Sequence, residues 1–154
     1  MKNWIRIIVA IVIVLVIDLI TKHFLFDVEY FNLIPNCVSI ATNGGNTGAA
    51  WGIMSGEILT LIIISFIMLI ALFIYNHFVK NKNLFYCLGF GFMVGGALGN
   101  LVDRVFLGYV RDFIFLDFWP TFPVFNVADS FLCVGTLMMA IFIIFGNEKG
   151  KNKC

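Results

Sequence analysis

The sequence predicts an all-α membrane protein with four transmembrane helices and a small extracytoplasmic β-sheet that forms a cradle between the first two helices. The first supporting observation is composition. Hydrophobic residues make up 61% of the 154 residues, charged residues only 12%, and the mean hydropathy is +1.00. A soluble domain averages about 25% charged residues and at this length buries only about 70% of the surface of its unfolded chain, so the excess apolar surface must face lipid. Composition and a net charge of +1 also exclude a disordered protein, a secreted disulfide scaffold and a nucleic-acid-binding protein.

The second observation is that long apolar stretches occur four times. A hydrocarbon core about 30 Å thick requires about 20 mostly apolar residues in a helix. The four stretches that meet this requirement are residues 4–24, 58–79, 84–102 and 126–145. None shows the two-residue alternation of a barrel strand, so we expect helices. The whole chain, residues 1–154, is expected to form a single integral-membrane domain.

The first stretch also has features of a cleavable signal peptide, because Lys2 and Arg6 precede an apolar run. The run is followed by Asp18 and Lys22 rather than by a small-residue cleavage site. Three further spans come after it, so we expect a retained transmembrane helix.

Basic residues predict the orientation of the four spans. Seven of the ten precede the first span, separate the second and third, or follow the fourth: Lys2, Arg6, Lys80, Lys82, Lys149, Lys151 and Lys153. By the positive-inside rule this face is cytoplasmic, with both chain termini. Most acidic residues then lie on the extracytoplasmic face.

The longest external segment, residues 25–57, contains a centre rich in turn-forming residues at 42–48. Residues 31–41 beside it are expected to pair as short strands. A small sheet on the membrane surface would be able to hold an extended peptide by strand addition, with glycines allowing close approach. The ordinary alternative for 42–48 is a surface turn.

Small and polar residues meet at the end of the third span. Gly95, Gly96 and Gly99 form a smooth strip that predicts close helix packing. Within the next turn come Asn100, Asp103 and Arg104. Ionisable groups at a membrane boundary are costly and usually paired, so Asp103 and Arg104 are either functional or a simple interfacial salt bridge.

Two further carboxylates are the strongest catalytic candidates. Asp112 lies just past the third span and Asp129 lies in the first turn of the fourth, so the topology places both at the external boundary. Two partly desolvated carboxylates can share a proton and act as base and acid. The alternative for Asp129 is an acidic residue that complements the helix dipole, with Asn126 as the N-cap.

Other catalytic arrangements fare worse. His23 is the one histidine expected on the external side, and Cys37 the one cysteine there. A serine or cysteine nucleophile, a zinc site and a structural disulfide are therefore not expected.

Four motifs in this order resemble those of the prolipoprotein signal peptidases, the type II signal peptidases of bacterial membranes. The first is Asp18 followed four residues later by Lys22. The others are residues 46–52 (NTGAAWG), residues 95–104 (GGALGNLVDR) with 108–113 (GYVRDF), and residues 125–129 (FNVAD). The resemblance covers essentially the whole chain. One departure is Trp51, where the family usually has Phe.

The resemblance implies a membrane aspartyl endopeptidase of the bacterial cytoplasmic membrane, with its active site at the extracytoplasmic face. It would cleave the signal peptide from diacylglyceryl-modified prolipoproteins just before the lipidated cysteine. No metal or organic cofactor is implied. Expected partners are lipid-modified prolipoproteins, membrane lipids and globomycin-type cyclic peptide inhibitors, and the chain is expected to be a monomer.

Carried over motif by motif, the resemblance implies three groups of site residues. The catalytic pair would be Asp112 and Asp129. The substrate-binding and site-shaping residues would be Asn46, Gly48, Asn100, Arg104 and Asn126. The supporting residues would be Asp18, Lys22, Asp103 and Ala128.

Two other classes of protein remain as alternatives. A small transporter would use boundary carboxylates as a proton or cation relay, but it predicts ionisable residues near the middle of several spans. A non-enzymatic scaffold accounts for the glycine strip and leaves Asp112 and Asp129 unexplained.

Overall fold

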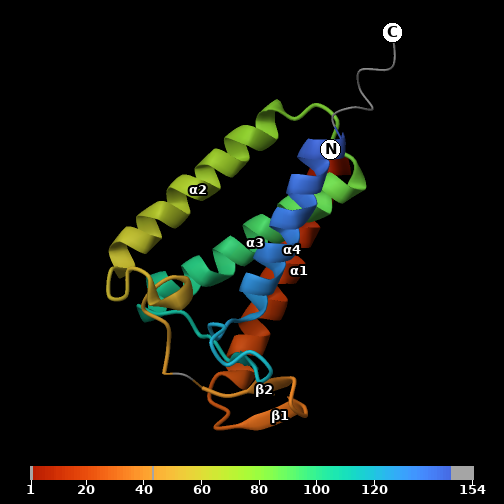
Figure 1. Cartoon of the computed structure of the whole chain (residues 1–154). Helices are drawn as coiled ribbons and strands as arrows, with labels where there is room; N and C mark the ends of the chain where they lie inside the picture. The colour runs from red at the N-terminus through yellow and green to blue at the C-terminus, as the bar shows by residue number, and fades with distance from the viewer. Residues whose placement is uncertain (1, 43, 147–154) are drawn as a thin grey trace.

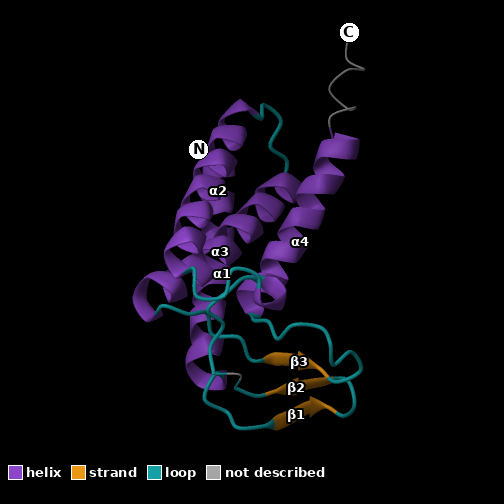
Figure 2. Ribbon diagram, turned by 60° about the vertical axis from the view of Figure 1, so that its left-hand side comes forward, coloured by secondary structure: helices purple, strands orange, loops and turns teal. Residues whose placement is uncertain are grey.

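The computed structural model describes residues 2–42 and 44–146, in which four long helices stand on a small sheet (Figures 1 and 2). The helices are α1 (Lys2–Leu25), α2 (Ile58–Phe78), α3 (Leu84–Leu107) and α4 (Val127–Ile141), and α4 continues into a π-helical turn, η2 (Phe142–Gly146). Each of the four is long and apolar enough to cross a membrane. The predicted fold class is confirmed, and each helix coincides with one of the four predicted apolar stretches to within a few residues.

The end of α3 is the main difference from the predicted spans. The helix ends at Leu107 rather than at Val102, so Asp103 and Arg104 are helical. Gly108 ends it, because its backbone adopts a left-handed conformation with φ of 77° and its N–H donates to the Arg104 carbonyl at 3.2 Å.

Helix α3 is the centre of the bundle and packs against α1, α4 and α2. In its most apolar stretch 67% of the residues are buried, against 11% in α2. The predicted close packing at the glycine strip is confirmed. Gly95 faces Val14 of α1 and Gly96 faces Ala128 of α4, and a Cβ at either glycine would collide with the neighbouring helix.

The sheet has three antiparallel strands in the order β1-β2-β3 (Figure 2). Strands β1 (Phe31–Ile34) and β2 (Val38–Ile40) lie within the segment where strands were expected. The third strand, β3 (Ile114–Leu116), comes from the connection between α3 and α4 and was not predicted. The sheet therefore joins the α1–α2 and α3–α4 connections instead of belonging only to the segment between α1 and α2.

A second pairing joins the same two connections nearer the helices. Asn46 and Val110 exchange backbone hydrogen bonds of 2.8 Å in both directions, next to a short 3-10 helix, η1 (Ala50–Gly52). Gly44 and Gly45 have positive φ, which glycine adopts without strain. Residues 44–48 are thus a bent segment that is anchored to Val110, two residues before Asp112.

The first turns of α1 and α3 and the last turn of η2 lie at the end of the bundle opposite the sheet (Figure 1). Lys149, Lys151, Lys153 and Cys154 lie outside the described residues, so the structure does not bear on their predicted location. Cys37, Cys87 and Cys133 are free.

Candidate functional site

A cavity of about 570 Å³ lies where α2, α3 and α4 meet the α1–α2 and α3–α4 connections. Both candidate carboxylates, Asp112 and Asp129, line it. Three other predicted site residues line it as well: Asn46, Asn100 and Arg104. The rest of the lining is mainly apolar and includes Met68 of α2 and Leu132 of α4. The cavity thus joins a polar wall to apolar helix faces.

Asp112 is nearly inaccessible, with 2% of its surface exposed. Its Oδ2 accepts a hydrogen bond from Asn46 Nδ2 at 2.8 Å, and its Oδ1 accepts one from Asn126 Nδ2 at 2.7 Å. Burial, reinforced by the nearby charge of Asp129, raises the pKa of Asp112 from 3.8 to about 7. The two amide donors oppose this rise but do not cancel it. Asp112 is therefore poised to exchange a proton near neutral pH.

Asp129 combines a structural role with a place in the cavity. Its backbone N–H donates to Asn126 Oδ1 at 2.9 Å and its Oδ2 accepts from the Asn126 backbone N–H at 3.2 Å, which together form a capping box. The helix-capping interpretation of Asp129 is thus confirmed. Its other oxygen, Oδ1, accepts from Asn100 Nδ2 at 2.7 Å. The capping box therefore holds the Asp129 side chain in an orientation that lets its Oδ1 contact Asn100.

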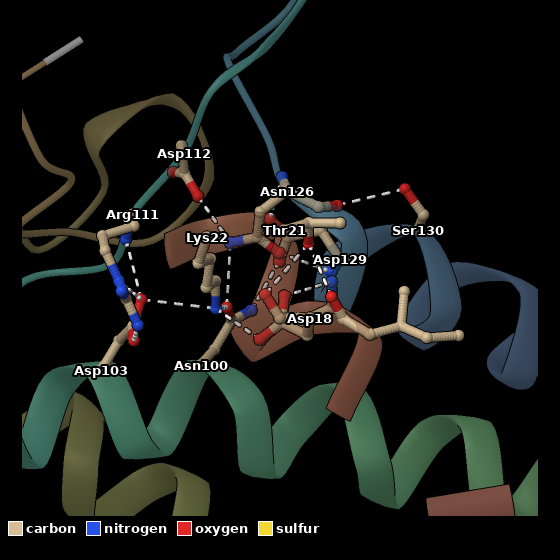
Figure 3. A network of polar contacts seen from close by, with 12 residues as sticks. Asp18, Thr21, Lys22, Asn100, Asp103, Arg111, Asp112, Asn126, Asp129 and Ser130 are labelled. Carbon is tan, nitrogen blue, oxygen red and sulfur yellow. Dashed lines mark hydrogen bonds and ion pairs between the residues drawn. The ribbon is translucent and has the colours of Figure 1, made fainter. Parts of the chain in front are cut away.

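Asn126 connects the two carboxylates (Figure 3). Its Nδ2 donates both to Asp112 Oδ1 and, at 3.0 Å, to Asn100 Oδ1. Because Asn100 Oδ1 also accepts from Lys22 Nζ at 3.0 Å, the Asn100 amide must turn its N–H group toward Asp129. The orientation of both amides is set by this network.

Beneath the amides lies a fully buried ionic cluster (Figure 3). Lys22 Nζ is 2.8 Å from Asp18 Oδ2 and 3.4 Å from Asp103 Oδ2, and none of the three side chains is appreciably exposed. Asp18 Oδ1 accepts from the Ala128 backbone N–H at 2.9 Å, so it satisfies a free donor in the first turn of α4. The cluster therefore ties α1 to α3 and α4 directly below the site.

Asp103 does not pair with Arg104, the cation of the proposed interfacial salt bridge. Its partners are Lys22 and Arg111, whose Nη2 lies 2.7 Å from Asp103 Oδ1. The simple Asp103–Arg104 salt bridge is therefore wrong, because successive residues on a helix point in different directions. Arg111 is the contributor that the sequence did not single out, although it lies within a matched motif.

Arg104 instead points into the cavity region, where its Nη2 donates to the Gly48 carbonyl at 3.0 Å. Its Nε is buried and has no hydrogen-bond partner among the described residues. Gly48 is itself buried, and a Cβ there would collide with the Ile53 carbonyl. Its N–H donates to Asn46 Oδ1 at 2.9 Å, which leaves the Asn46 amino group to reach Asp112.

The cavity lining does not favour catalysis by a serine or cysteine nucleophile, because the part of it that the structure describes provides no histidine to act as the base. Its described residues include Ser65, Ser130 and Cys133 but no histidine. Among the described residues, no group of three or more histidine, cysteine or acidic side chains is arranged to hold a metal ion. What the cavity does bring together is a pair of carboxylates held by amides.

The chain is similar to several known proteins over most of its length. The family model described as "Signal peptidase (SPase) II" matches residues 10–145. A "Lipoprotein signal peptidase" of Staphylococcus aureus is 38% identical over 149 residues, covering 92% of this chain and 90% of the relative. The homologous protein of Staphylococcus aureus strain MRSA252 matches equally well.

Two solved structures have the same fold. One, described as "Bacterial membrane enzyme structure by the in meso method at 2.3 A resolution", is 36% identical with a TM-score of 0.81, covering 96% of this chain and 92% of the other. The second, a bacterial membrane enzyme solved by the same method at 1.9 Å, is 38% identical with a TM-score of 0.76, covering 90% and 92%.

Proposed function

This chain belongs to the signal peptidase II family of membrane aspartic peptidases, and we propose that Asp112 and Asp129 are its catalytic dyad. Its activity is that of the family, the removal of signal peptides from prolipoproteins. The observation that carries the dyad proposal is that both carboxylates line one cavity and are linked through Asn126. Asp112 is also buried, and burial favours the protonated form of a carboxyl.

In the proposed reaction one carboxylate is ionised and the other protonated. The ionised group takes a proton from a water molecule, whose oxygen attacks the scissile carbonyl carbon. The protonated group donates a hydrogen bond to the carbonyl oxygen and then passes its proton to the leaving amine. The C–N bond breaks, and the dyad again holds one proton.

The surrounding polar residues have distinct proposed roles. Asn46 and Asn126 orient Asp112, and Asn100 orients Asp129, through the hydrogen bonds described above. Arg104, held by the Gly48 carbonyl, is available to donate to substrate carbonyls from the cavity wall. Removing one donor to a developing oxyanion typically costs about 10²–10³ in rate. Asp18, Lys22, Asp103 and the Ala128 N–H support these residues from below.

The substrate is proposed to be a prolipoprotein whose cysteine carries a diacylglyceryl group, cleaved just before that cysteine. The combined polar and apolar lining suits a peptide bond next to a lipid anchor. We further propose that globomycin-type cyclic peptides bind here, that the chain acts as a monomeric single peptidase domain spanning residues 1–154, and that it resides in the bacterial cytoplasmic membrane.

The direct test is incubation of the purified chain with a diacylglyceryl-modified prolipoprotein. Cleavage is expected to shift its electrophoretic mobility, and mass spectrometry of the product should place the lipidated cysteine at the new N-terminus. The unmodified prolipoprotein serves as the control. Equal cleavage of both forms would contradict the proposed substrate, and a product beginning elsewhere would contradict the proposed cleavage position.

The proposed orientation predicts where fused reporters are found. A reporter after Lys82 or at the C-terminus is expected in the cytoplasm, and one inserted between Val28 and Gly56 is expected outside, because basic residues are retained on the cytoplasmic side. Reporter activity in intact cells measures this. A cytoplasmic readout for the 28–56 segment would invert the proposed topology.

Arg104→Ala is expected to lower turnover strongly while the protein still inserts and keeps most of its stability. Its described contacts include one side-chain hydrogen bond, to the Gly48 carbonyl, and such a bond from a charged group contributes about 1.5–3 kcal/mol. Losing a partly desolvated cation offsets some of that cost. Specific activity and melting temperature in detergent measure the two effects. A large loss of stability with undiminished specific activity would assign Arg104 to folding instead.

Stability is expected to fall as the pH rises from about 4 to about 7, and to fall less in Asp112→Asn. Since the pKa of Asp112 is raised to about 7, the folded protein keeps a proton that the unfolded chain loses near its ordinary pKa of 3.8. Raising the pH across this range therefore favours unfolding, and the asparagine variant lacks the contribution of Asp112. Melting temperatures of both proteins across the range test it. A wild-type minus variant difference that stays constant with pH would contradict the raised pKa.

A further inference from the structure

The end of the bundle opposite the dyad carries positive charge without described counter-ions. Here α1 begins, α2 ends and α3 begins (Figure 1). Four cations belong to this end and are called the basic rim: Lys2, Arg6, Lys80 and Lys82. Within residues 2–42 and 44–146, every aspartate and glutamate lies in the half of the molecule that contains the dyad and the sheet, and the ion pairs formed there involve Lys22 and Arg111.

The described partners of the rim are neutral. Lys82 Nζ lies over the indole of Trp4, 5.8 Å from the ring centroid. Arg6 Nη1 donates to Asn3 Oδ1 at 3.4 Å. A cation–π contact and an amide hydrogen bond position a cation without cancelling its charge. The first contact also holds the segment before α3 against the start of α1.

Exposed apolar side chains lie directly beside these cations. Trp4 is 47% exposed and Ile5 61%, and at the neighbouring helix ends Phe78 and Leu84 are also exposed. A ligand that satisfies both features carries negative charge at one end and hydrocarbon at the other. A free phosphate ion would use only the cations and leave the apolar surface uncovered.

We propose that the basic rim binds the headgroup of an anionic phospholipid, whose acyl chains lie along the exposed residues of α1. Lys82 and Arg6 contact the phosphodiester, and Trp4 lies at the level of the headgroup, where tryptophan is favoured. This site is separate from the catalytic cavity. The competing explanation is that these charges serve only to orient the chain in the membrane.

Tryptophan fluorescence provides a direct test, because the chain has 3 tryptophans and one of them is Trp4. Trp51→Phe and Trp119→Phe leave Trp4 as the sole tryptophan, which is excited selectively over the tyrosines. This variant is reconstituted in phosphatidylcholine vesicles that contain equal fractions of either brominated phosphatidylglycerol or brominated phosphatidylcholine. Quenching of Trp4 is expected to be stronger with the anionic lipid. The binding constant for phosphatidylglycerol relative to phosphatidylcholine is expected to rise about five-fold for each cation that contacts the headgroup.

Charge-matched variants make the test specific. Arg6→Gln with Lys82→Gln is expected to bring the relative binding constant close to one. Asn32→Asp with Asn36→Asp changes the net charge equally, but in the sheet region, and is expected to preserve the preference. Equal quenching by the two lipids, or a preference that survives Arg6→Gln with Lys82→Gln, would overturn the proposal. The readout involves no cleavage, so it is independent of the proposed catalytic dyad.

Discussion

Asp112→Asn and Asp129→Asn are each expected to fold, insert into the membrane and lose nearly all cleavage of a lipid-modified prolipoprotein. Asparagine keeps the volume of the side chain and one acceptor oxygen, so much of the hydrogen-bonded frame around each position remains. It cannot take up or release a proton in the reaction. Loss of a general acid or base typically lowers the rate by about 10²–10⁴-fold.

The double variant distinguishes a dyad from two independent contributors. If the two carboxylates act in the same step, removing the second adds little to removing the first, because groups that work as a unit are strongly non-additive. Asp117→Asn is the matched control. Asp117 accepts a hydrogen bond from Ser39 Oγ at 2.6 Å at the end of β3, outside the cavity lining, and asparagine can accept the same bond. We expect this control to retain activity.

Near-wild-type cleavage by either single variant in the mobility-shift assay would exclude the aspartyl mechanism for this chain. Independent, multiplicative losses in the double variant would contradict a shared step. Since the variants are compared in the same assay with the same substrate, neither result depends on knowing which carboxyl holds the proton at rest.

The helices were predictable because lipid imposes a simple requirement on them. Spans of about 20 apolar residues can be recognised without tertiary information, and their alternating direction places Asp112 and Asp129 at one boundary. The packing of Gly95 and Gly96 was predictable for a similar reason, since small residues permit close helix approach.

The parts that were not predictable depend on contacts between distant segments. Strand β3 has only three residues in an aromatic-rich connection, and its pairing with β2 defines it as a strand. One of the two described partners of Asp103 is Arg111, which reaches it because Gly108 ends α3 and turns the chain back. Local spacing instead suggested Arg104, the next residue in sequence.

The complete burial of Lys22 was likewise not predictable from the sequence. Lys22→Met is expected to destabilise the protein by about 3–5 kcal/mol, because it leaves two buried carboxylates, Asp18 and Asp103, without the cation between them. Asp103 keeps Arg111, but Asp18 keeps only the Ala128 N–H as a described partner. The uncompensated charge of Asp18 is therefore the main cost.

Two variants isolate that cost by thermal unfolding in detergent. Adding Asp18→Asn to Lys22→Met removes the stranded charge while leaving an oxygen for the Ala128 N–H, so the double variant is expected to recover part of the lost stability. Lys80→Met removes an equal charge from an exposed position and is expected to change stability by no more than about 0.5 kcal/mol. If Lys22→Met unfolds at the wild-type temperature, or if Asp18→Asn lowers its stability further, the ionic cluster does not support the site in the way that its distances indicate.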